Sequence, residues 1–184
     1  MKSAFIHFAE GFEEIEAITI ADVLHRADIP TELISITGKL AVTGAHGITI
    51  HTDKLFEEAD YAEAGILILP GGLPGANNLN AHSGLKEKLL EFHKEGKPVA
   101  AICAAPLVLG GLDILQGKEA ACYPGFESKL KGAAISYQPA IKSGNIITGR
   151  GPGAALNFAL ELVAELKDRK LADTLSEGML VQTW

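Results

Sequence analysis

The chain has 184 residues, of which 47% are hydrophobic and 21% charged, a composition typical of folded proteins and far from that of disordered ones. A chain of this length is expected to form one domain covering residues 1–184. The formal net charge is −7 and the sequence has no cluster of lysines and arginines, which argues against a nucleic-acid partner.

The first half of the chain alternates short apolar runs with helical patterns. Apolar runs bounded by turn residues predict strands, whereas apolar residues at helical spacing predict helices. A hairpin is expected around Gly44 and Gly47, and Ser83 is expected to cap a helix. The predicted strands are 3–9, 31–36, 40–42, 48–51 and 65–69, and the predicted helices are 13–27 and 83–94.

The second half continues the same alternation of strands and helices. Strands that alternate with helices predict an α/β fold, in which a mostly parallel sheet is covered by helices on both faces. Such sheets place ligands at the carboxyl ends of their strands. The predicted elements are a strand at 98–102, a helix after Cys103, a weak strand at 119–122, a hairpin around 143–145, a strand at 146–148 and a helix at 154–167.

Cys103 lies between small residues in the segment Ala101-Ile102-Cys103-Ala104-Ala105, the arrangement of a nucleophile elbow. This turn would expose the sulfur at the start of a helix, where unpaired amides and the helix dipole favour thiolate, so we predict a lowered pKa and a reactive cysteine. The alternative is a buried structural cysteine in an alanine-rich segment. Cys122 has no comparable setting and is expected in the core.

Glu16 extends the apolar stripe of the first predicted helix, so its carboxyl is expected on the buried face. Burial would raise its pKa and allow it to donate a hydrogen bond or transfer a proton. The alternative is an exposed residue at a frayed helix end. Glu13 and Glu14 are expected to be solvated charges in the first helical turn. The stripe itself consists of Ile20, Val23, Leu24 and Ala27.

Two glycine-rich segments, 70–72 and 150–153, follow predicted strands. Glycine lets backbone amides approach a bound group closely, so Pro70-Gly71-Gly72 could form an oxyanion site. An ordinary turn is the alternative for both segments.

The sequence carries no recognisable signal for metal binding, export or membrane insertion. The six histidines show neither an HExxH motif nor a close pair at ligand spacing, so we expect no zinc site and no obligatory cofactor. The first residues lack the apolar run of a secretory signal, and segment 98–115 is interrupted by proline, glycine and aspartate. Two cysteines without CxxC spacing suit a reducing compartment, so we expect a cytoplasmic protein without membrane contact.

Four segments, in this order along the chain, resemble the ThiJ/PfpI superfamily, most closely the branch of Parkinson disease protein seven and its bacterial homologues. The resemblance implies a flavodoxin-like three-layer sandwich that usually assembles as a homodimer. The segments are 11–16 (GFEEIE), 69–72 (LPGG), 100–106 (AAICAAP) and 149–153 (GRGPG).

The resemblance also implies roles for particular residues. Cys103 and Glu16 match catalytic positions that share a hydrogen bond. The amides of Gly72 and Ala104 would line an anion pocket near the sulfur, and Arg26 matches a position that borders this pocket.

The sequence departs from the family pattern at several positions. Tyr123 stands where several members have a histidine, so a cysteine-histidine pair is not available, although the tyrosine could contribute a hydroxyl. His46 replaces a second anion-binding arginine and could bind a charged ligand only when protonated. Ala104 replaces the histidine of the peptidase-like branch, and no histidine follows His93, so neither proteolysis nor amidotransferase activity is expected.

Two functions follow from the resemblance. The first is a glyoxalase-like or deglycase-like activity on methylglyoxal and related carbonyls, in which Cys103 forms a hemithioacetal and Glu16 relays the proton. Catalysis is expected to be weak because no histidine assists. The second is a non-catalytic oxidative-stress sensor or chaperone-like protein, in which Cys103 is oxidised to sulfinate. The same thiolate serves both functions, so the sequence does not separate them.

Overall fold

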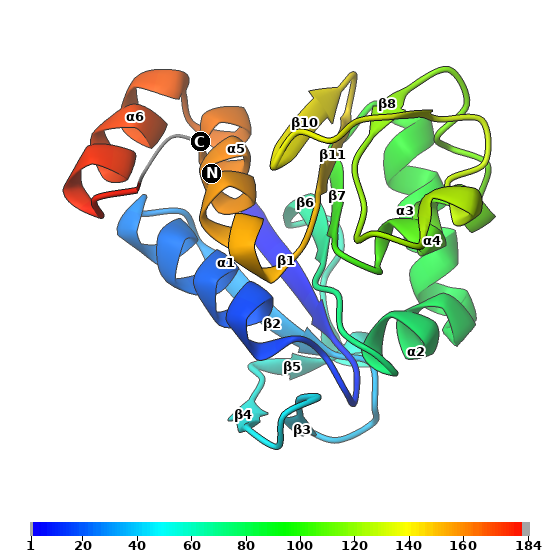
Figure 1. Ribbon diagram of the computed structural model, residues 1–184. Coiled ribbons are helices and arrows are strands. Elements are labelled where there is room, and N and C mark those ends of the chain that lie inside the picture. Colours follow the sequence, from blue (N-terminus) through cyan, green and yellow to red (C-terminus); the bar gives the residue numbers. More distant parts are fainter. Residues whose placement is uncertain (1, 182–184) are drawn as a thin grey trace.

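The computed structural model, which describes residues 2–181, contains a central sheet of seven strands (Figure 1). The strand order is β10-β11-β7-β6-β1-β2-β5, and all neighbouring pairs are parallel except β10 with β11. This arrangement confirms the predicted mostly parallel sheet. The strands are β1 (Ser3–Phe8), β2 (Thr31–Ser35), β5 (Lys54–Leu55), β6 (Ala64–Leu69), β7 (Val99–Ile102), β10 (Ala140–Ser143) and β11 (Ile146–Gly149).

Two small sheets lie outside the central one. The predicted hairpin around Gly44 and Gly47 is confirmed as an antiparallel pair. The weak strand predicted at 119–122 shortens to two residues, which pair in parallel with a second short strand. The bounds are β3 (Ala41–Thr43), β4 (Thr49–His51), β8 (Glu119–Ala120) and β9 (Ala134–Ile135).

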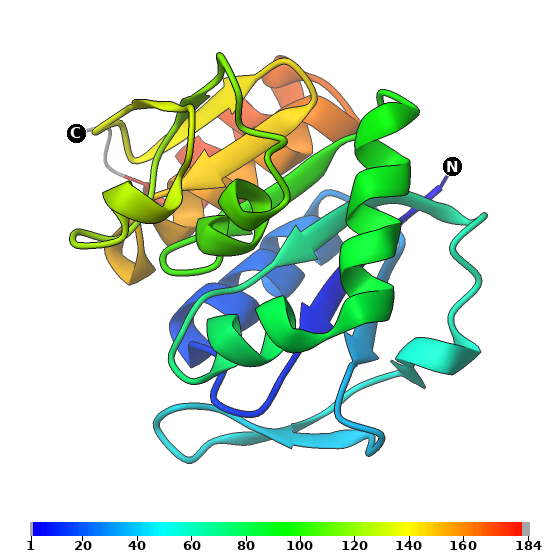
Figure 2. The same ribbon diagram turned by 90° about the vertical axis from the view of Figure 1, so that its right-hand side faces the viewer.

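Helices cover both faces of the central sheet, which gives the three-layer flavodoxin-like sandwich (Figures 1 and 2). One face carries α1 and α5 side by side, with α6 packed on α5, and the other carries α2, α3 and α4. The α-helices are α1 (Glu14–Arg26), α2 (Gly75–Ala81), α3 (Ser83–Lys94), α4 (Pro106–Gly111), α5 (Ala155–Leu166) and α6 (Arg169–Gly178), and 3₁₀-helices span Phe56–Glu58, Glu127–Lys129 and Pro152–Ala154.

Two helices, α2 and α6, are absent from the sequence-based prediction. Helix α2 contains three asparagines, which are weak helix formers, and it depends on packing against β1 and α4. Helix α6 does carry a local signal, because Asp168 caps it by accepting a hydrogen bond from the Leu171 N–H at 2.8 Å. Within residues 2–181, no helix is long and apolar enough to span a lipid bilayer.

The central strands form the core because helices cover them on both sides. In β6, Ile66, Leu67 and Ile68 are 0% exposed, and burying each such side chain contributes roughly 1.5–3 kcal/mol. Continuous apolar runs are therefore required here, in place of the alternating pattern of a sheet with one solvated face. This rigid layer fixes the positions of the loops at its carboxyl edge.

The chain leaves β1 toward β2 on one side and later returns to β6 on the other side of β1. In open α/β sheets, ligands bind outside the carboxyl ends of the strands at such a change of direction. The loops that follow β1, β6 and β7 all begin at this edge, because the three strands are parallel. The first two of these loops precede α1 and α2, and the third begins with Cys103.

Candidate active site

Cys103 occupies a sharp turn directly after β7. Its φ is +64°, a left-handed conformation that residues with a side chain rarely adopt. Two backbone hydrogen bonds hold the turn: the Cys103 N–H donates to the Gly149 carbonyl at 2.9 Å, and the Tyr123 N–H donates to the Cys103 carbonyl at 2.8 Å. Backbone strain of this kind costs on the order of 1–3 kcal/mol and gathers at functional sites. The residue is 8% exposed, less than the exposed sulfur predicted from the sequence.

Glu16 lies on α1 and is 0% exposed, in agreement with the buried face predicted for it. Its Oε2 accepts a hydrogen bond from the Gly71 N–H at 2.8 Å. Its Oε1 is buried and has no well-aligned hydrogen-bond donor among the residues that the structure describes. The Cys103 thiol is near enough to affect the pKa of this carboxyl. The structure therefore brings the two predicted residues together, although they are far apart in the sequence.

Gly71 allows this close approach. A Cβ atom at residue 71 would lie 2.6 Å from the Cys103 Cβ and 2.8 Å from the Glu16 Oε2, both well inside van der Waals contact. Any side chain here would push the thiol and the carboxyl apart. Packing thus requires a glycine at residue 71, in addition to the ordinary role of glycine in a turn.

The pKa values of Glu16 and Cys103 are both raised. Burial raises the pKa of Glu16 to about 7, against the lowering effect of Cys103 and the Gly71 N–H. Burial, followed by the charge of Glu16, raises the pKa of Cys103 to about 12, whereas the Gly72 and Ala104 amides lower it.

The lowered cysteine pKa predicted from the sequence is therefore wrong in direction. Burial and the nearby carboxylate outweigh the amides. Helix α4 begins only at Pro106 and has six residues, so its dipole adds little. The negative charge of Glu16 disappears when its carboxyl is protonated. A thiolate is then easier to form, and the pair behaves as one unit that shares a proton.

The backbone N–H groups of Gly72 and Ala104 lie beside the Cys103 sulfur. Neither donates to a backbone or side-chain oxygen elsewhere in residues 2–181. Gly72 has a φ of +89°, and a Cβ there would lie 2.6 Å from the Gly11 carbonyl oxygen, so only glycine fits. Two free donors beside a nucleophile are suited to binding a developing oxyanion.

Arg26 is not brought to the cysteine within this chain. It lies ten residues after Glu16 on α1, about 15 Å further along the helix at 1.5 Å per residue. Its side chain is half-exposed and pairs with Asp22 at 2.6 Å. The predicted place of Arg26 at the anion pocket is therefore not formed by one copy of the chain.

Tyr123 follows Cys122 in a loop beside the cysteine turn, and its side chain is 47% exposed. Its ring lies against Gly151, where a Cβ would be 3.0 Å from the ring. Both residues line a surface cavity of about 270 Å³, together with Tyr137, Arg150 and Pro152. Cys122 is buried, as expected, and both cysteines are free thiols.

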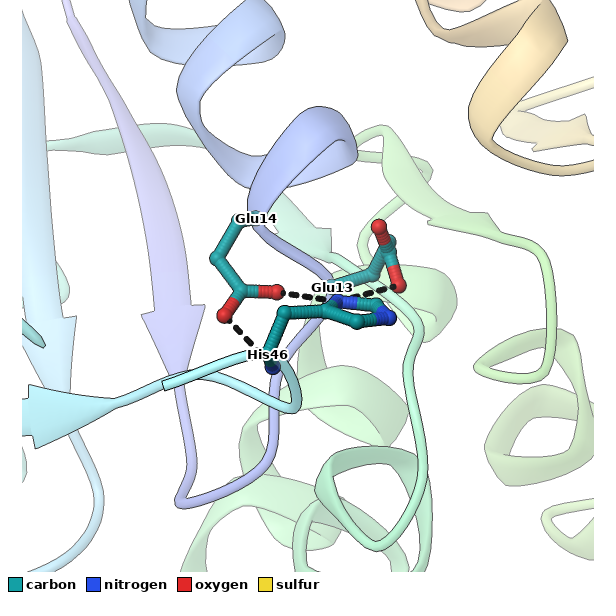
Figure 3. Close-up of side chains that lie close together, drawn as sticks. All are labelled: Glu13, Glu14 and His46. Carbon is teal, nitrogen blue, oxygen red and sulfur yellow. Dashed lines mark hydrogen bonds and ion pairs between the residues drawn. The ribbon is translucent and has the colours of Figure 1, made fainter. Parts of the chain in front are cut away.

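His46 lies in the β3–β4 loop beside Glu13 and Glu14 (Figure 3). Its Nδ1 is 2.8 Å from Glu14 Oε2 and 3.6 Å from Glu13 Oε2. The hydrogen bond to Glu14, followed by the charge of Glu13, raises the pKa of His46. Two carboxylates already neutralise the imidazolium, so His46 is not a free anion-binding group.

The prediction of solvated Glu13 and Glu14 side chains is also wrong, because these residues are only 9% and 5% exposed. The β3–β4 hairpin folds over the start of α1 and covers them. Sequence reasoning misses this cluster because His46 lies 32 residues after Glu14 in the chain.

The fold and this site define a class: α/β sandwiches in which a strained cysteine follows a central strand and meets a buried carboxyl from the first helix. Residues 2–165 match the DJ-1/PfpI family. The chain belongs to this family, as the resemblance in the sequence implied.

Several relatives match this chain over nearly all of their own length. Protein dj-1beta of Drosophila melanogaster is 35% identical over 182 residues, covering 98% of this chain and 97% of the relative. A deglycase of Pyrococcus abyssi is 33% identical over 166 residues, covering 86% of this chain and 96% of the relative. Among solved structures, oxidized Toxoplasma gondii DJ-1 has a TM-score of 0.94 at 30% identity, covering 100% of both chains.

Proposed function

We propose that this chain is a cysteine-dependent glyoxalase-like or deglycase-like enzyme that acts on methylglyoxal and related reactive carbonyls. The observation that carries the proposal is the buried Glu16 carboxyl beside Cys103, with Gly71 packed against both. A thiol and a proton-exchanging acid in contact are the two groups that addition to an aldehyde requires. The deglycase name of the Pyrococcus abyssi relative supports the same chemistry.

In the first step, the Cys103 sulfur attacks the aldehyde carbon and the C=O π electrons move to oxygen. The thiol proton passes through Glu16 to that oxygen, which gives a neutral hemithioacetal. A carboxyl with a pKa raised to about 7 can both accept and return a proton near neutral pH. The Gly72 and Ala104 N–H groups would stabilise the transient oxyanion, a contribution of roughly 3 kcal/mol per donor.

With methylglyoxal, Glu16 would then remove a proton from C1 of the hemithioacetal and return it to C2. The product is a thioester of lactate, which water hydrolyses to lactate and the free thiol. Atoms and electrons balance as methylglyoxal plus water giving lactate, without an external oxidant or a cofactor. Tyr123 supplies no imidazole, so Glu16 carries the proton alone and turnover is slow.

A second candidate function is an oxidative-stress sensor or chaperone-like protein. Peroxide would oxidise the Cys103 thiolate to sulfenate and, with a second equivalent, to sulfinate, releasing one water in each step. Protonated Glu16 could donate its hydrogen to a sulfinate oxygen, because its Oε1 has no other well-aligned partner within the described part of the chain. The solved relative from Toxoplasma gondii is an oxidized form, which favours the same chemistry.

We also infer a homodimer in a reducing, cytoplasmic setting. Ile15 and Ile18 on α1 are 57% and 44% exposed, so a second copy could cover them. Arg26 could border an anion pocket only if a second copy supplied it, because it lies far along α1 from Glu16. Two free thiols suit a reducing compartment.

Methylglyoxal consumption and lactate formation, measured on three variants, test the proposal. Cys103→Ser is expected to abolish turnover, because the serine hydroxyl is a far weaker nucleophile. Glu16→Gln is expected to reduce turnover at least 100-fold, since the amide fits the space and cannot relay a proton. Cys122→Ala is the matched control and should retain activity.

Unchanged turnover in either of the first two variants contradicts the assigned roles. A different pair of results would favour the sensor function. If the wild-type chain consumes no methylglyoxal, and mass spectrometry finds Cys103 to be the first residue that mild peroxide oxidises, the second candidate is supported.

A further inference from the structure

Three potential metal ligands meet where the β3–β4 loop covers the start of α1. Glu13, Glu14 and His46 each offer one ligand atom, and these atoms lie within 4.8 Å of one another. Figure 3 shows the two carboxyl groups on either side of the imidazole, with a dashed line from each to the ring. The cluster borders the Cys103 and Glu16 pair, because the charge of Glu13 contributes to the raised pKa of Glu16, but the proposed carbonyl chemistry does not use it.

Glu13 is the member of this cluster with the weaker partner, because it shares His46 with Glu14. The residue is only 9% exposed, and no hydrogen-bond donor reaches its carboxyl within residues 2–181. The nearest charged group, His46 Nδ1, is 3.6 Å away and faces Glu14 at the shorter distance of 2.8 Å. A carboxylate that exposes so little surface gains only part of its compensation from an imidazole at 3.6 Å, so it retains the capacity to bind a further cation. The Glu13 carboxylate faces the same imidazole nitrogen as Glu14, which is the arrangement that a shared metal ion would require.

Glu14 is held in a fixed orientation by the loop. Its Oε1 accepts the His46 N–H at 2.7 Å and the Ile48 N–H at 3.3 Å, which leaves Oε2 directed at the imidazole. Gly44 lies against this carboxyl, and a Cβ there would collide with it. Outer hydrogen bonds of this kind orient ligands in metal sites.

We propose that Glu13, Glu14 and His46 form a binding site for one divalent transition-metal ion, for which Zn²⁺ is the natural probe. Two carboxylates and a neutral imidazole carry a charge of −2, which matches the ion. One nitrogen and two oxygen ligands suit zinc, and three protein ligands leave a position for water. On binding, His46 releases the Nδ1 proton to solvent and the metal takes its place between the imidazole and Glu14.

This site reverses the electrostatic character expected at His46. The family resemblance implies an anion-binding position there, whereas the two buried carboxylates make the cluster negative when the imidazole is neutral. The inference does not rest on the proposed enzymatic function.

Isothermal titration with ZnCl₂ on the Cys103→Ser chain tests the proposal, since this background removes the reactive thiol as a competing ligand. One equivalent is expected to bind. His46→Asn and Glu13→Gln should each weaken binding at least 10-fold, and both preserve side-chain size closely enough for folding. His51→Asn is the matched control, an exposed histidine on the neighbouring strand, and should bind as tightly as its parent. Equal affinity in His46→Asn, or no binding to the parent, overturns the proposal.

Cobalt absorption on the otherwise unmodified chain gives a second measurement. Co²⁺ in the cluster should show d–d bands without a thiolate-to-metal charge-transfer band, and Cys103→Ser should leave the spectrum unchanged. A thiolate band that disappears in Cys103→Ser, with no remaining d–d bands, would place the metal at the cysteine and refute the proposal.

Discussion

Glu14 and Glu16 are two residues apart on the same helix and both expose little surface, at 5% and 0%, but Glu16 lies deeper, and their pKa values move in opposite directions. Burial is the largest single influence on both and raises both. At Glu14 it is outweighed by the combined hydrogen bonds of His46 and of the backbone N–H groups of residues 14, 46 and 48, so the pKa is lowered. At Glu16 the donors are too few, and the pKa rises to about 7.

The difference shows that depth and the number of donors together decide what a buried carboxyl can do. A carboxyl with several donors stays ionised and serves as a structural anchor or a ligand. A carboxyl with one donor is poised to hold a proton near neutral pH, which is the property that acid–base chemistry requires. The first turns of α1 thus present one carboxyl of each kind, and the loop after β6 supplies only one donor to Glu16.

Gly71→Ala is expected to produce the largest effect, because it breaks the Glu16 side of the comparison without changing either functional residue. The added methyl group would lie 2.6 Å from the Cys103 Cβ and 2.8 Å from Glu16 Oε2. The thiol and the carboxyl must therefore separate, and kcat/KM for methylglyoxal should fall about 100-fold, corresponding to roughly 2.7 kcal/mol.

Gly178→Ala is the matched control, because nothing lies within 4 Å of a Cβ at that position. It should leave kcat/KM unchanged. Circular dichroism should show native helix content for both variants. Full activity in a folded Gly71→Ala protein would mean that contact between Glu16 and Cys103 is unnecessary.

The elements that the sequence predicts correctly are those with a local cause. The run 65–69 is apolar throughout because β6 is buried on both faces, and the small residues around Cys103 permit the sharp turn. The face of α1 that carries Glu16 also follows from helical spacing alone.

The features that the sequence does not predict depend on contacts between distant segments. Glu13 and Glu14 look solvated until the β3–β4 loop is placed over them, and only then does His46 become their partner. The raised pKa of Cys103 has the same origin, because the opposing carboxylate comes from α1. Motif spacing identifies the cysteine, but the charge around it is a property of the folded chain.

His7 extends the comparison to a buried base, which is neutral in the folded chain, and predicts a smaller effect, on stability. It is 0% exposed on β1, its Nε2 is 3.0 Å from the Tyr61 hydroxyl, and its Nδ1 has no partner in the part of the chain that the structure describes. Burial lowers the pKa of His7 to about 3, and nearby His82 lowers it slightly further.

The His7 imidazole therefore stays unprotonated in the folded chain, whereas in the unfolded chain it binds a proton below about pH 6.5. His7 therefore lowers the free energy of unfolding as the pH falls from 6.5 toward 3. Between pH 7 and pH 5 the loss attributable to His7 should be about 2 kcal/mol. Urea unfolding at both pH values should show a correspondingly smaller loss in His7→Asn than in the unmodified chain. Equal losses would mean that the buried imidazole accepts the proton in the folded state.

Glu14→Gln tests the other side of the comparison and carries the smallest expected effect. The glutamine side-chain oxygen can still accept the N–H groups of His46 and Ile48, so the loop stays anchored. What disappears is the charge that favours protonated His46, and His46 is exposed enough for solvent to weaken that attraction. The free energy of unfolding in metal-free buffer should fall by only about 1 kcal/mol, measured by urea titration beside Glu10→Gln, whose carboxyl accepts a single N–H from the same hairpin. A loss several times larger would mean that the charge of Glu14, and not the number of donors around it, stabilises the loop, and the contrast with Glu16 would then need a different physical explanation.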